Sequence, residues 1–196
     1  MESFVKIGVL ALQGDFAEHE VMLRRLKVDA FQVRLPAELS GLDGLIIPGG
    51  ESTTIGKLSE DFHLIDPLRE FAQGHAIWGT CAGAIFLSKD VRRNQPLLHL
   101  MDITVERNAF GRQLESFEAD LEVPELKRVA GSDRAYHAIF IRAPIIQSVR
   151  GQAKVLATTS DKRIVAARQG HLLATSFHPE LTPDTRFHEY FLSLAD

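Results

Sequence analysis

The segment Ala76-Ile77-Trp78-Gly79-Thr80-Cys81-Ala82-Gly83 decides how the rest of the chain is interpreted. Residues 76–78 form a short apolar run that predicts a buried strand, and residues 84–87 predict a helix. Cys81 therefore stands in a Gly-x-nucleophile-x-Gly elbow between a strand and a helix. Its glycines permit a tight, strained turn that lifts the thiol clear of the sheet, where we expect it to be exposed. The N-terminus of the following helix favours the nucleophilic thiolate. A lone cysteine is more often a buried structural residue, but this context favours a nucleophile.

Strand-like and helix-like segments alternate through the first half of the chain. The strands predicted there are residues 7–12, 31–35, 45–47 and 76–78, and the helices are residues 17–26, 62–72 and 84–87. Such alternation predicts an α/β fold, with a mostly parallel sheet covered by helices on both faces. Sites in such folds gather at the carboxyl ends of the strands, so the Gly-bearing turns that end these strands should share one edge.

The second half is richer in strands and poorer in helices. We predict strands at residues 103–105, 117–123, 138–141, 155–157, 164–167 and 172–177, as antiparallel additions to the sheet, and a final helix over residues 183–194. Residues 94–98 and 125–134 are predicted to be loops. No repeat or linker is apparent, so we expect one domain over residues 1–196.

Composition excludes several functional classes. The net charge is −4 and no basic stripe is present, so we expect no nucleic-acid partner. No apolar run approaches membrane length, and the N-terminal residues lack the basic region of a signal peptide. Cys81 is the one cysteine, which excludes an intrachain disulfide and suits a reducing compartment. We expect a soluble, cytoplasmic protein without a membrane association.

A cysteine nucleophile needs a base and a group that orients the base, and His178-Pro179-Glu180 offers both. The tripeptide follows a predicted strand, and residues two apart on an extended segment face the same way. Glu180 is therefore predicted to support His178 while His178 faces Cys81. The tripeptide alone is a weak signal, but together with the elbow it is a strong one.

Pro48-Gly49-Gly50-Glu51-Ser52 also ends a predicted strand. Consecutive glycines allow N–H groups to converge on an anion, which suits an oxyanion hole completed by the N–H of Ala82. A phosphate-binding loop is excluded, because five residues separate Gly50 from Gly56 and Leu58 replaces the required Ser or Thr. Taken alone, the segment is equally compatible with a simple turn.

We predict no metal site and no cofactor. His188-Glu189 lacks the second histidine of a zinc helix, since position 192 is Leu192, and one cysteine excludes cysteine-rich zinc sites. His19, between two glutamates on a predicted helix, is interpreted as a solvated surface residue.

The elbow, the Gly-Gly turn and His178-Pro179-Glu180 resemble those of the class I, triad-type glutamine amidotransferases. Further segments resemble the glutaminase subunits of pyridoxal 5′-phosphate synthase across nearly the whole chain. They are Val9-Leu10-Ala11-Leu12-Gln13-Gly14, Pro48-Gly49-Gly50-Glu51-Ser52-Thr53-Thr54, Glu106-Arg107-Asn108-Ala109-Phe110-Gly111-Arg112-Gln113, Phe140-Ile141-Arg142-Ala143-Pro144 and Ser176-Phe177-His178-Pro179-Glu180-Leu181-Thr182.

This resemblance implies a three-layer αβα sandwich with a flavodoxin-like mixed sheet. It implies that Cys81 attacks the side-chain amide of L-glutamine, that His178 passes the proton to the leaving ammonia, and that Glu180 orients His178. Glutamine-binding positions in the family match Gly50, Glu51, Ser52, Arg107, Ile141 and Arg142. The ammonia would pass to a synthase subunit, in a hetero-oligomer that makes pyridoxal 5′-phosphate.

Three alternatives stay open at this point. The first is the glutaminase of another amidotransferase, such as imidazole glycerol phosphate synthase or anthranilate synthase, against which Glu51-Ser52-Thr53-Thr54 and Phe110-Gly111-Arg112-Gln113 argue. The second is a single-cysteine protease or deglycase on a related sheet, which need not carry His-Pro-Glu after a late strand. The third is a regulatory binding module with a dead site, against which the intact triad argues.

Overall fold

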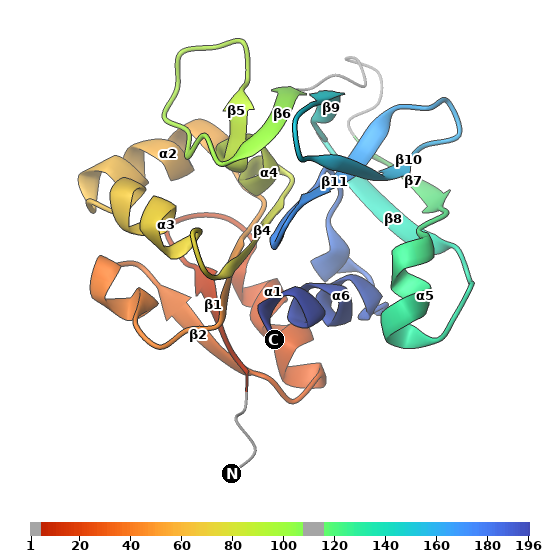
Figure 1. Cartoon of the computed structure of the whole chain (residues 1–196), viewed down its shortest axis with the longest axis horizontal. Coiled ribbons are helices and arrows are strands. Elements are labelled where there is room, and N and C mark those ends of the chain that lie inside the picture. The colour runs from red at the N-terminus through yellow and green to blue at the C-terminus, as the bar shows by residue number, and fades with distance from the viewer. Residues whose placement is uncertain (1–4, 108–115) are drawn as a thin grey trace.

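The structure is a computed structural model that describes residues 5–107 and 116–196 (Figure 1). Within these residues a ten-stranded mixed sheet runs in the order β2-β1-β3-β4-β12-β11-β9-β6-β5, with β10 paired to β11. Its strands are β1 (Lys6–Leu10), β2 (Asp29–Val33), β3 (Gly44–Ile47), β4 (Ala76–Thr80), β5 (Ser88–Asp90), β6 (Met101–Glu106), β9 (Ile145–Val149), β10 (Lys154–Thr158), β11 (Ile164–Gln169) and β12 (Leu172–Thr175). A separate antiparallel hairpin consists of β7 (Ser116–Leu121) and β8 (Tyr136–Ile141).

Six α-helices and two short 3-10 helices complete the described part of the chain. The α-helices are α1 (Phe16–Arg25), α2 (Ser52–Asp61), α3 (Ile65–Phe71), α4 (Ala82–Leu87), α5 (Pro124–Ala130) and α6 (Arg186–Ala195). The 3-10 helices are η1 (Pro36–Leu39) and η2 (Pro179–Leu181).

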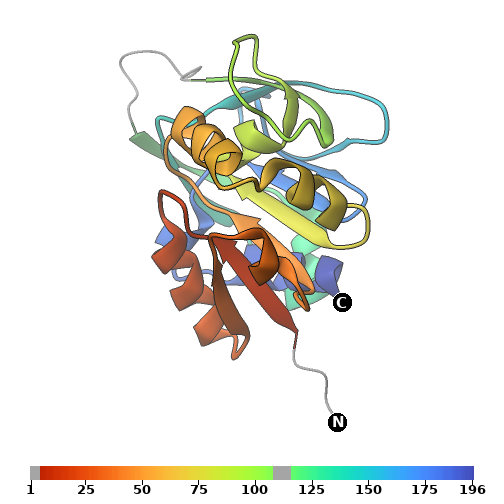
Figure 2. The ribbon, with the colours of Figure 1, turned by 90° about the vertical axis from the view of Figure 1, so that its left-hand side faces the viewer.

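The central strands of the parallel half of the sheet are buried on both faces. Strands β2, β1, β3, β4 and β12 pair in parallel, and every residue of β3, β4 and β12 is buried. Successive side chains point to opposite faces, so Ile77 packs with Ile55 of α2 and Leu68 of α3, whereas the next residue, Trp78, packs with Phe187 of α6. Helices α2, α3 and α4 cover one face, and α1, α5, α6 and the β7–β8 hairpin cover the other (Figures 1 and 2).

The predicted α/β fold with a mixed sheet covered on both faces is confirmed. The antiparallel additions are confirmed for β6, β10 and β11. The prediction was wrong for residues 117–123 and 138–141, which form the separate β7–β8 hairpin, and for β12, which also pairs in parallel with β4. Strands β1, β3, β4 and β12 are parallel neighbours, so the segments that follow them meet at one edge of the sheet. This edge carries the turn at Gln13, the Gly49-Gly50 turn, the Cys81 elbow and His178.

Two predictions about local structure were wrong. Residues 125–134 are not a loop throughout, because α5 spans Pro124–Ala130 and buries Leu126 in the core. Pro124 at its first turn and Gly131 at its C-cap, with φ of 65°, are ordinary helix boundary signals. The helix predicted over residues 62–72 starts at Ile65.

Helix α2 (Ser52–Asp61) and strand β9 (Ile145–Val149) were not predicted. The sequence of α2 is polar and contains Gly56, both of which weaken a helical signal. Gly56 is needed because a Cβ there would lie 2.8 Å from the carbonyl oxygen of Pro96. Close packing therefore explains a glycine that local propensity disfavours.

Candidate active site

The elbow predicted around Cys81 is present between β4 and α4. Cys81 has φ of 48° and ψ of −104°, a region that residues with side chains seldom adopt. Its N–H donates to the carbonyl oxygen of Thr175 in β12 at 2.8 Å. A Cβ on Gly83 would lie 2.0 Å from the carbonyl oxygen of Ile47, and a Cβ on Gly79 would lie 2.4 Å from the backbone of Gly83. The two flanking glycines therefore allow the close backbone packing that holds Cys81 in this strained conformation.

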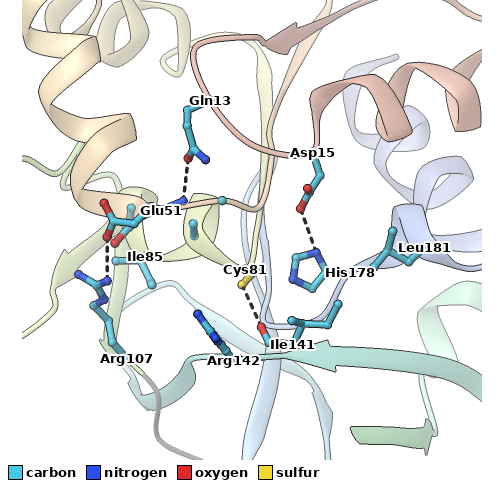
Figure 3. A pocket seen from close by; sticks show the side chains of 13 residues that line it. Gln13, Asp15, Glu51, Cys81, Ile85, Arg107, Ile141, Arg142, His178 and Leu181 are labelled. Atoms are coloured by element: carbon cyan, nitrogen blue, oxygen red, sulfur yellow. Dashed lines mark hydrogen bonds and ion pairs between the residues drawn. The ribbon is translucent and has the colours of Figure 1, made fainter. Parts of the chain in front are cut away.

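The thiol of Cys81 lies in a cavity of about 460 Å³ (Figure 3). The expectation that Cys81 is exposed was wrong, because only 7% of the residue is accessible. The thiol lies against strand β8, where it donates to the carbonyl oxygen of Ile141 at 3.9 Å. The cavity is lined by Gln13, Asp15, Gly50, Glu51, Ser52, Cys81, Ala82, Ile85, Arg107, Ile141, Arg142, His178 and Leu181.

His178 and Glu180 form the predicted pair. His178 Nδ1 lies 2.6 Å from Glu180 Oε1, and both side chains are almost fully buried. The N–H of His178 donates to the carbonyl oxygen of Ile139, which ties the segment to β8. The predicted reason for the contact was wrong in one respect, since the segment is not extended. Pro179 begins the 3-10 helix η2, so Glu180 turns back onto His178 within that helix.

The electrostatics of the pair favour a protonated imidazole. Burial lowers the pKa of His178, but hydrogen bonds to Asp15, to Cys81 and to Glu180 outweigh burial and raise this pKa well above its ordinary value. Asp15 Oδ2 lies 3.5 Å from Nδ1 of the ring. Burial also raises the pKa of Glu180, although its hydrogen bond to His178 opposes this effect. A charged imidazole in the same cavity as Cys81 is the arrangement that stabilises a thiolate.

The Gly49-Gly50 turn lies directly against His178. A Cβ on Gly49 would be 2.6 Å from Cε1 of the imidazole. The carbonyl of Gly49 accepts from the N–H of Asp15 at 3.0 Å, which fixes the plane of the peptide that also carries the N–H of Gly50. Gly50 and Ala82 both line the cavity that contains Cys81. The turn and the start of α4 therefore lie at the same cavity as the thiol.

The cavity also contains an ion pair between Arg107 and Glu51 (Figure 3). Arg107 Nη2 donates to Glu51 Oε1 at 2.8 Å, and its other terminal nitrogen donates to Thr53 Oγ1 at 3.1 Å. Glu51 caps α2 by accepting from the N–H of Thr54 at 2.7 Å. Desolvation opposes ionisation of Glu51, but the hydrogen bonds from Thr54, Thr53 and Arg107 lower its pKa to about 2. Glu51 is therefore an anion at neutral pH.

The other predicted substrate positions line the same cavity: Gly50, Ser52, Ile141 and Arg142. Ser52 is buried and its hydroxyl accepts from Gln95 at 3.3 Å. Arg142 has φ of 45° and directly follows Ile141, the carbonyl partner of the thiol. The rest of the segment Glu106–Gln113, residues 108–113, lies outside the described residues.

Comparison with known proteins identifies the family. Residues 9–195 match the SNO glutamine amidotransferase family. The chain belongs to this family. A protein of Herpetosiphon aurantiacus named pyridoxal 5′-phosphate synthase subunit PdxT is 57% identical, over 96% of this chain and 99% of its own length. A protein of the same name from Roseiflexus sp. is 56% identical, with the same coverage of both chains.

Solved structures agree with the family assignment. A crystal structure described as a glutamine amidotransferase has a TM-score of 0.89 and 50% identity, and the match covers 96% of this chain and 98% of that chain. The structure of PurLQS from Thermotoga maritima has a TM-score of 0.70 at 14% identity, over 99% of this chain and 100% of that chain, which shows likeness of fold alone.

Sequence reasoning missed four residues in the cavity of this amidotransferase: Gln13, Asp15, Ile85 and Leu181. Gln13 Oε1 accepts from the N–H of Glu51 at 2.7 Å, so it links the end of β1 to the turn after β3. The signal for Gln13 and Asp15 was their position in the turn that ends the first predicted strand, at the same sheet edge as the triad.

The interpretation of His19 as a solvated residue was wrong. His19 is completely buried, and Nδ1 lies 3.1 Å from Nε2 of His188. Met22 and Leu23 face the core, and His19 precedes them by three and four residues respectively. Residues at this spacing lie on the same side of a helix, so the spacing alone places His19 on the apolar side of α1. The flanking glutamates concealed this signal.

Asp15, His178 and Glu180 place one ligand atom each within 4.8 Å of one another. Within residues 5–107 and 116–196 they form the one group of three such side chains close enough to hold a metal ion. A metal there would take the imidazole nitrogen that now contacts Glu180, so it would compete with the triad. In the same residue ranges, no helix has the length and apolar character needed to cross a bilayer.

Proposed function

We propose that this chain hydrolyses L-glutamine to glutamate and ammonia through a thioester on Cys81. The observation that supports this most directly is the Cys81-His178-Glu180 arrangement in one cavity, in a chain of the SNO glutamine amidotransferase family. A hydrogen bond joins His178 to Glu180, and both His178 and Cys81 line the cavity. Nucleophile, proton carrier and orienting carboxylate are the three parts that thioester chemistry requires.

The reaction follows from these positions. The thiolate of Cys81 attacks the side-chain amide carbon of glutamine and forms a tetrahedral oxyanion. The imidazolium of His178 gives its proton to the amide nitrogen, the carbon–nitrogen bond breaks, and ammonia leaves. His178, now neutral, takes a proton from water, which attacks the thioester and releases glutamate. Glu180 stays ionised and stabilises the imidazolium at each stage.

We assign the oxyanion hole to Gly49, Gly50 and Ala82. The N–H of Ala82 follows the nucleophile at the start of α4, and the Gly49-Gly50 turn lies against His178. Backbone donors aimed at the developing charge stabilise it more than the neutral amide of the substrate. We expect the N–H of Gly49 or Gly50 to be poorly aimed at this charge in the isolated chain.

Glutamine is a zwitterion, and the cavity offers both complementary charges. Arg107 and Arg142 suit the α-carboxylate, because a guanidinium donates paired hydrogen bonds to it. Glu51, which is ionised, suits the α-ammonium group. Gly50, Ser52 and Ile141 complete the proposed substrate wall.

The ammonia is proposed to feed a synthase subunit that makes pyridoxal 5′-phosphate in a hetero-oligomer. The relatives at 57% and 56% identity carry the name pyridoxal 5′-phosphate synthase subunit PdxT. We propose that residues 1–196 act as one amidotransferase domain in the cytoplasm, since the family match spans residues 9–195. No cofactor is needed for this chemistry.

We further propose that this chain is activated by the synthase subunit. The two glycines add no side-chain obstacle to a flip of the peptide between them, so its present orientation depends on the hydrogen bond from the N–H of Asp15 to the carbonyl of Gly49. A partner that docks beside the turn would fix the peptide in the orientation that aims its N–H at the oxyanion. Ammonia would then be released mainly when the enzyme that uses it is bound. One misplaced oxyanion donor costs on the order of 10² to 10³ in turnover.

Steady-state ammonia release tests both proposals. The wild type and Cys81→Ala are assayed with glutamine, each alone and with saturating synthase subunit. We expect activity from the wild type, stimulation by the partner, and none from Cys81→Ala, which should remain folded. Near wild-type activity in Cys81→Ala would refute the nucleophile assignment, whereas equal rates with and without partner would refute activation alone.

A further inference from the structure

A buried polar cluster lies on the far side of Glu180 from the substrate cavity. It consists of His19 in α1, His188 in α6 and Thr80 in β4, which are all completely buried. His19 Nε2 lies 3.2 Å from Thr80 Oγ1 and 3.4 Å from Glu180 Oε2. His19 Nδ1 lies 3.1 Å from His188 Nε2. One histidine therefore touches the acidic member of the triad and the residue that precedes the nucleophile.

The hydrogen bonds of this cluster select one tautomer for each ring. Burial, together with the nearby His188 and His178, lowers the pKa of His19 well below its ordinary value, and burial lowers that of His188 to about 3. Both rings are therefore neutral at physiological pH, and each carries one proton. The contact between Nδ1 of His19 and Nε2 of His188 uses one proton, which must come from one of the two rings.

If His19 donated this proton, His188 would carry its own proton on Nδ1, which is buried and has no partner within the described residues. The bare Nε2 of His19 would then face the carboxylate of Glu180. If His188 donates from Nε2 instead, its Nδ1 carries a lone pair, so what is left unpartnered is an acceptor and not a donor. The proton of His19 then sits on Nε2, which lies between Thr80 and Glu180. An orphaned buried donor costs more than the alternative, so the second arrangement is favoured.

This assignment matters because it places an N–H dipole beside the outer oxygen of Glu180, which has no hydrogen-bond partner among the described residues. Oε1 contacts His178, whereas Oε2 is buried and makes no hydrogen bond in the part of the chain that the structure describes. The titratable groups that act on this carboxyl are His178, Asp15, His19 and Tyr136. Glu18 and Arg25 of α1 line a second, shallow cavity that Glu180 also lines. Of these groups, the neutral His19 is the one whose ring nitrogen lies beside Oε2, at 3.4 Å, although the hydrogen bond of that nitrogen is to Thr80.

We propose that His19 is a positioning residue of the triad: its Nε2–H, which Thr80 Oγ1 accepts, lies 3.4 Å from the outer oxygen of Glu180 and stabilises the negative charge there, while His188 fixes the tautomer that carries this proton. The proposal rests on the proposed glutaminase function. It adds His19 and His188 to Cys81, His178 and Glu180 as residues on which the triad depends. His19 does not line the substrate cavity, so it acts through Glu180 rather than on glutamine. It also joins Glu180 to Thr80, so the elbow and the carboxylate are held by one side chain.

Loss of the Nε2–H has a defined consequence for pH. Burial already raises the pKa of Glu180, and removal of a donor from its carboxylate raises this pKa further. The carboxyl then binds a proton at higher pH and no longer stabilises the imidazolium of His178. The pH at which the thiolate–imidazolium pair of Cys81 and His178 forms should therefore move upward.

Two amide variants form a matched pair for the test. In His19→Gln the side-chain amide reaches the place of Nε2 and keeps a donor near Glu180. In His19→Asn the amide reaches only the place of Nδ1, so Glu180 loses the donor while the site stays polar. Phe191→Leu serves as a stability control, since Phe191 packs on Trp78 in the same core, away from the triad. Thermal unfolding establishes that each variant is folded.

The variants are assayed over pH 5 to 9 as the complex with saturating synthase subunit. We expect His19→Asn to lower kcat by about 10- to 100-fold with little change in KM, the range found when a partner that orients a functional histidine is lost. The acid limb of kcat/KM should rise by about one pH unit. His19→Gln should recover most of both losses, and Phe191→Leu should keep the wild-type pH profile. Equal behaviour of His19→Asn and His19→Gln would overturn the proposal, as would a wild-type profile in His19→Asn.

Alkylation of Cys81 by iodoacetamide supplies a readout that needs no substrate. Cys81 is the one thiol of the chain, so the rate reports its thiolate alone. The alkylation profile of His19→Asn should move to higher pH, and that of His19→Gln should not. If wild-type protein releases no ammonia yet this shift is present, the proposed function fails while the positioning role of His19 stands. An unshifted profile in His19→Asn refutes the positioning role, whatever the substrate.

Discussion

Substitution of Gly83 by alanine should both destabilise the protein and impair its active site. A Cβ at Gly83 would lie 2.0 Å from the carbonyl oxygen of Ile47, about 1.4 Å closer than an ordinary contact of 3.4 Å. The obstacle is backbone of β3, a central strand that pairs with both β1 and β4. No side-chain rotation can relieve it, so either the strand or the elbow must move.

The magnitude follows from two opposing effects. Overpacking of a tight interior costs about 1–3 kcal/mol, and a backbone obstacle belongs at the upper end of that range. Alanine gains about 0.5–1 kcal/mol over glycine in a helix interior. We therefore expect a net loss of about 2 kcal/mol or more in the free energy of unfolding. If the elbow moves, Cys81 shifts relative to His178, and a displacement of about 1 Å can cost on the order of 10² in rate.

Two other glycines calibrate the result. Gly74→Ala meets no atom within 4 Å and should stay within about 0.5 kcal/mol of the wild type. Gly8→Ala meets the side-chain methyl groups of Leu42, Leu45 and Val33 at 2.6 to 2.9 Å, which can shift, so an intermediate loss is expected.

Urea unfolding midpoints and glutamine hydrolysis are measured for all three variants. The order of destabilisation should be Gly83→Ala, then Gly8→Ala, then Gly74→Ala, with unchanged denaturant slopes. A Gly83→Ala protein that matched Gly74→Ala in stability and retained full activity would refute the reasoning.

Three further predictions concern the triad, the substrate and pH. Glu180→Gln should impair turnover less than His178→Asn, because Glu180 only orients the ring that moves protons, and the reverse order in one glutaminase assay would contradict the assigned roles. Arg107→Ala should raise KM for glutamine, with Arg107→Lys a poor substitute, whereas unchanged KM and kcat would remove Arg107 from the site. Acid should destabilise the fold through His188, because burial lowers its pKa in the folded state from 6.5 to about 3. Above pH 6.5 neither the folded nor the unfolded protein protonates this ring, and between pH 6.5 and about 3 only the unfolded protein does. Between pH 7.5 and 5 the wild type should therefore lose about 2 kcal/mol more than His188→Phe in urea unfolding, and equal losses would contradict a neutral buried ring.

Local patterns were sufficient to predict the parallel strands and to place Cys81, His178 and Glu180 at one edge of the sheet. The apolar runs before Gly49, Cys81 and His178 are strands in the structure, and the parallel arrangement places their ends at one edge. Such runs are informative because a strand buried on both faces must be apolar throughout. The spacing of Cys81 and His178 in the sequence carries no distance information, so the prediction that they share one site came from topology alone.

Residues whose state depends on distant partners were not predictable in this way. His19 looked solvated because its neighbours in sequence, Glu18 and Glu20, are acidic, yet it is buried by Trp78 and His188. Helix α5 was missed because its one fully buried apolar residue, Leu126, packs against elements far along the chain. A short sequence window contains neither partner.

The strained backbone of Cys81 is held from three sides that belong to different parts of the sequence. The N–H of Cys81 is bonded to Thr175 in β12, Gly83 packs against Ile47 in β3, and the helix after the elbow is buried throughout. The same two strands, β3 and β12, continue into the Gly49-Gly50 turn and into His178. A shift of either strand therefore disturbs the elbow and, at the same time, the Gly49-Gly50 turn or His178. Strain at the nucleophile and alignment of the site thus depend on one set of core contacts, so variants that loosen β3 or β12 should lose activity and stability in parallel.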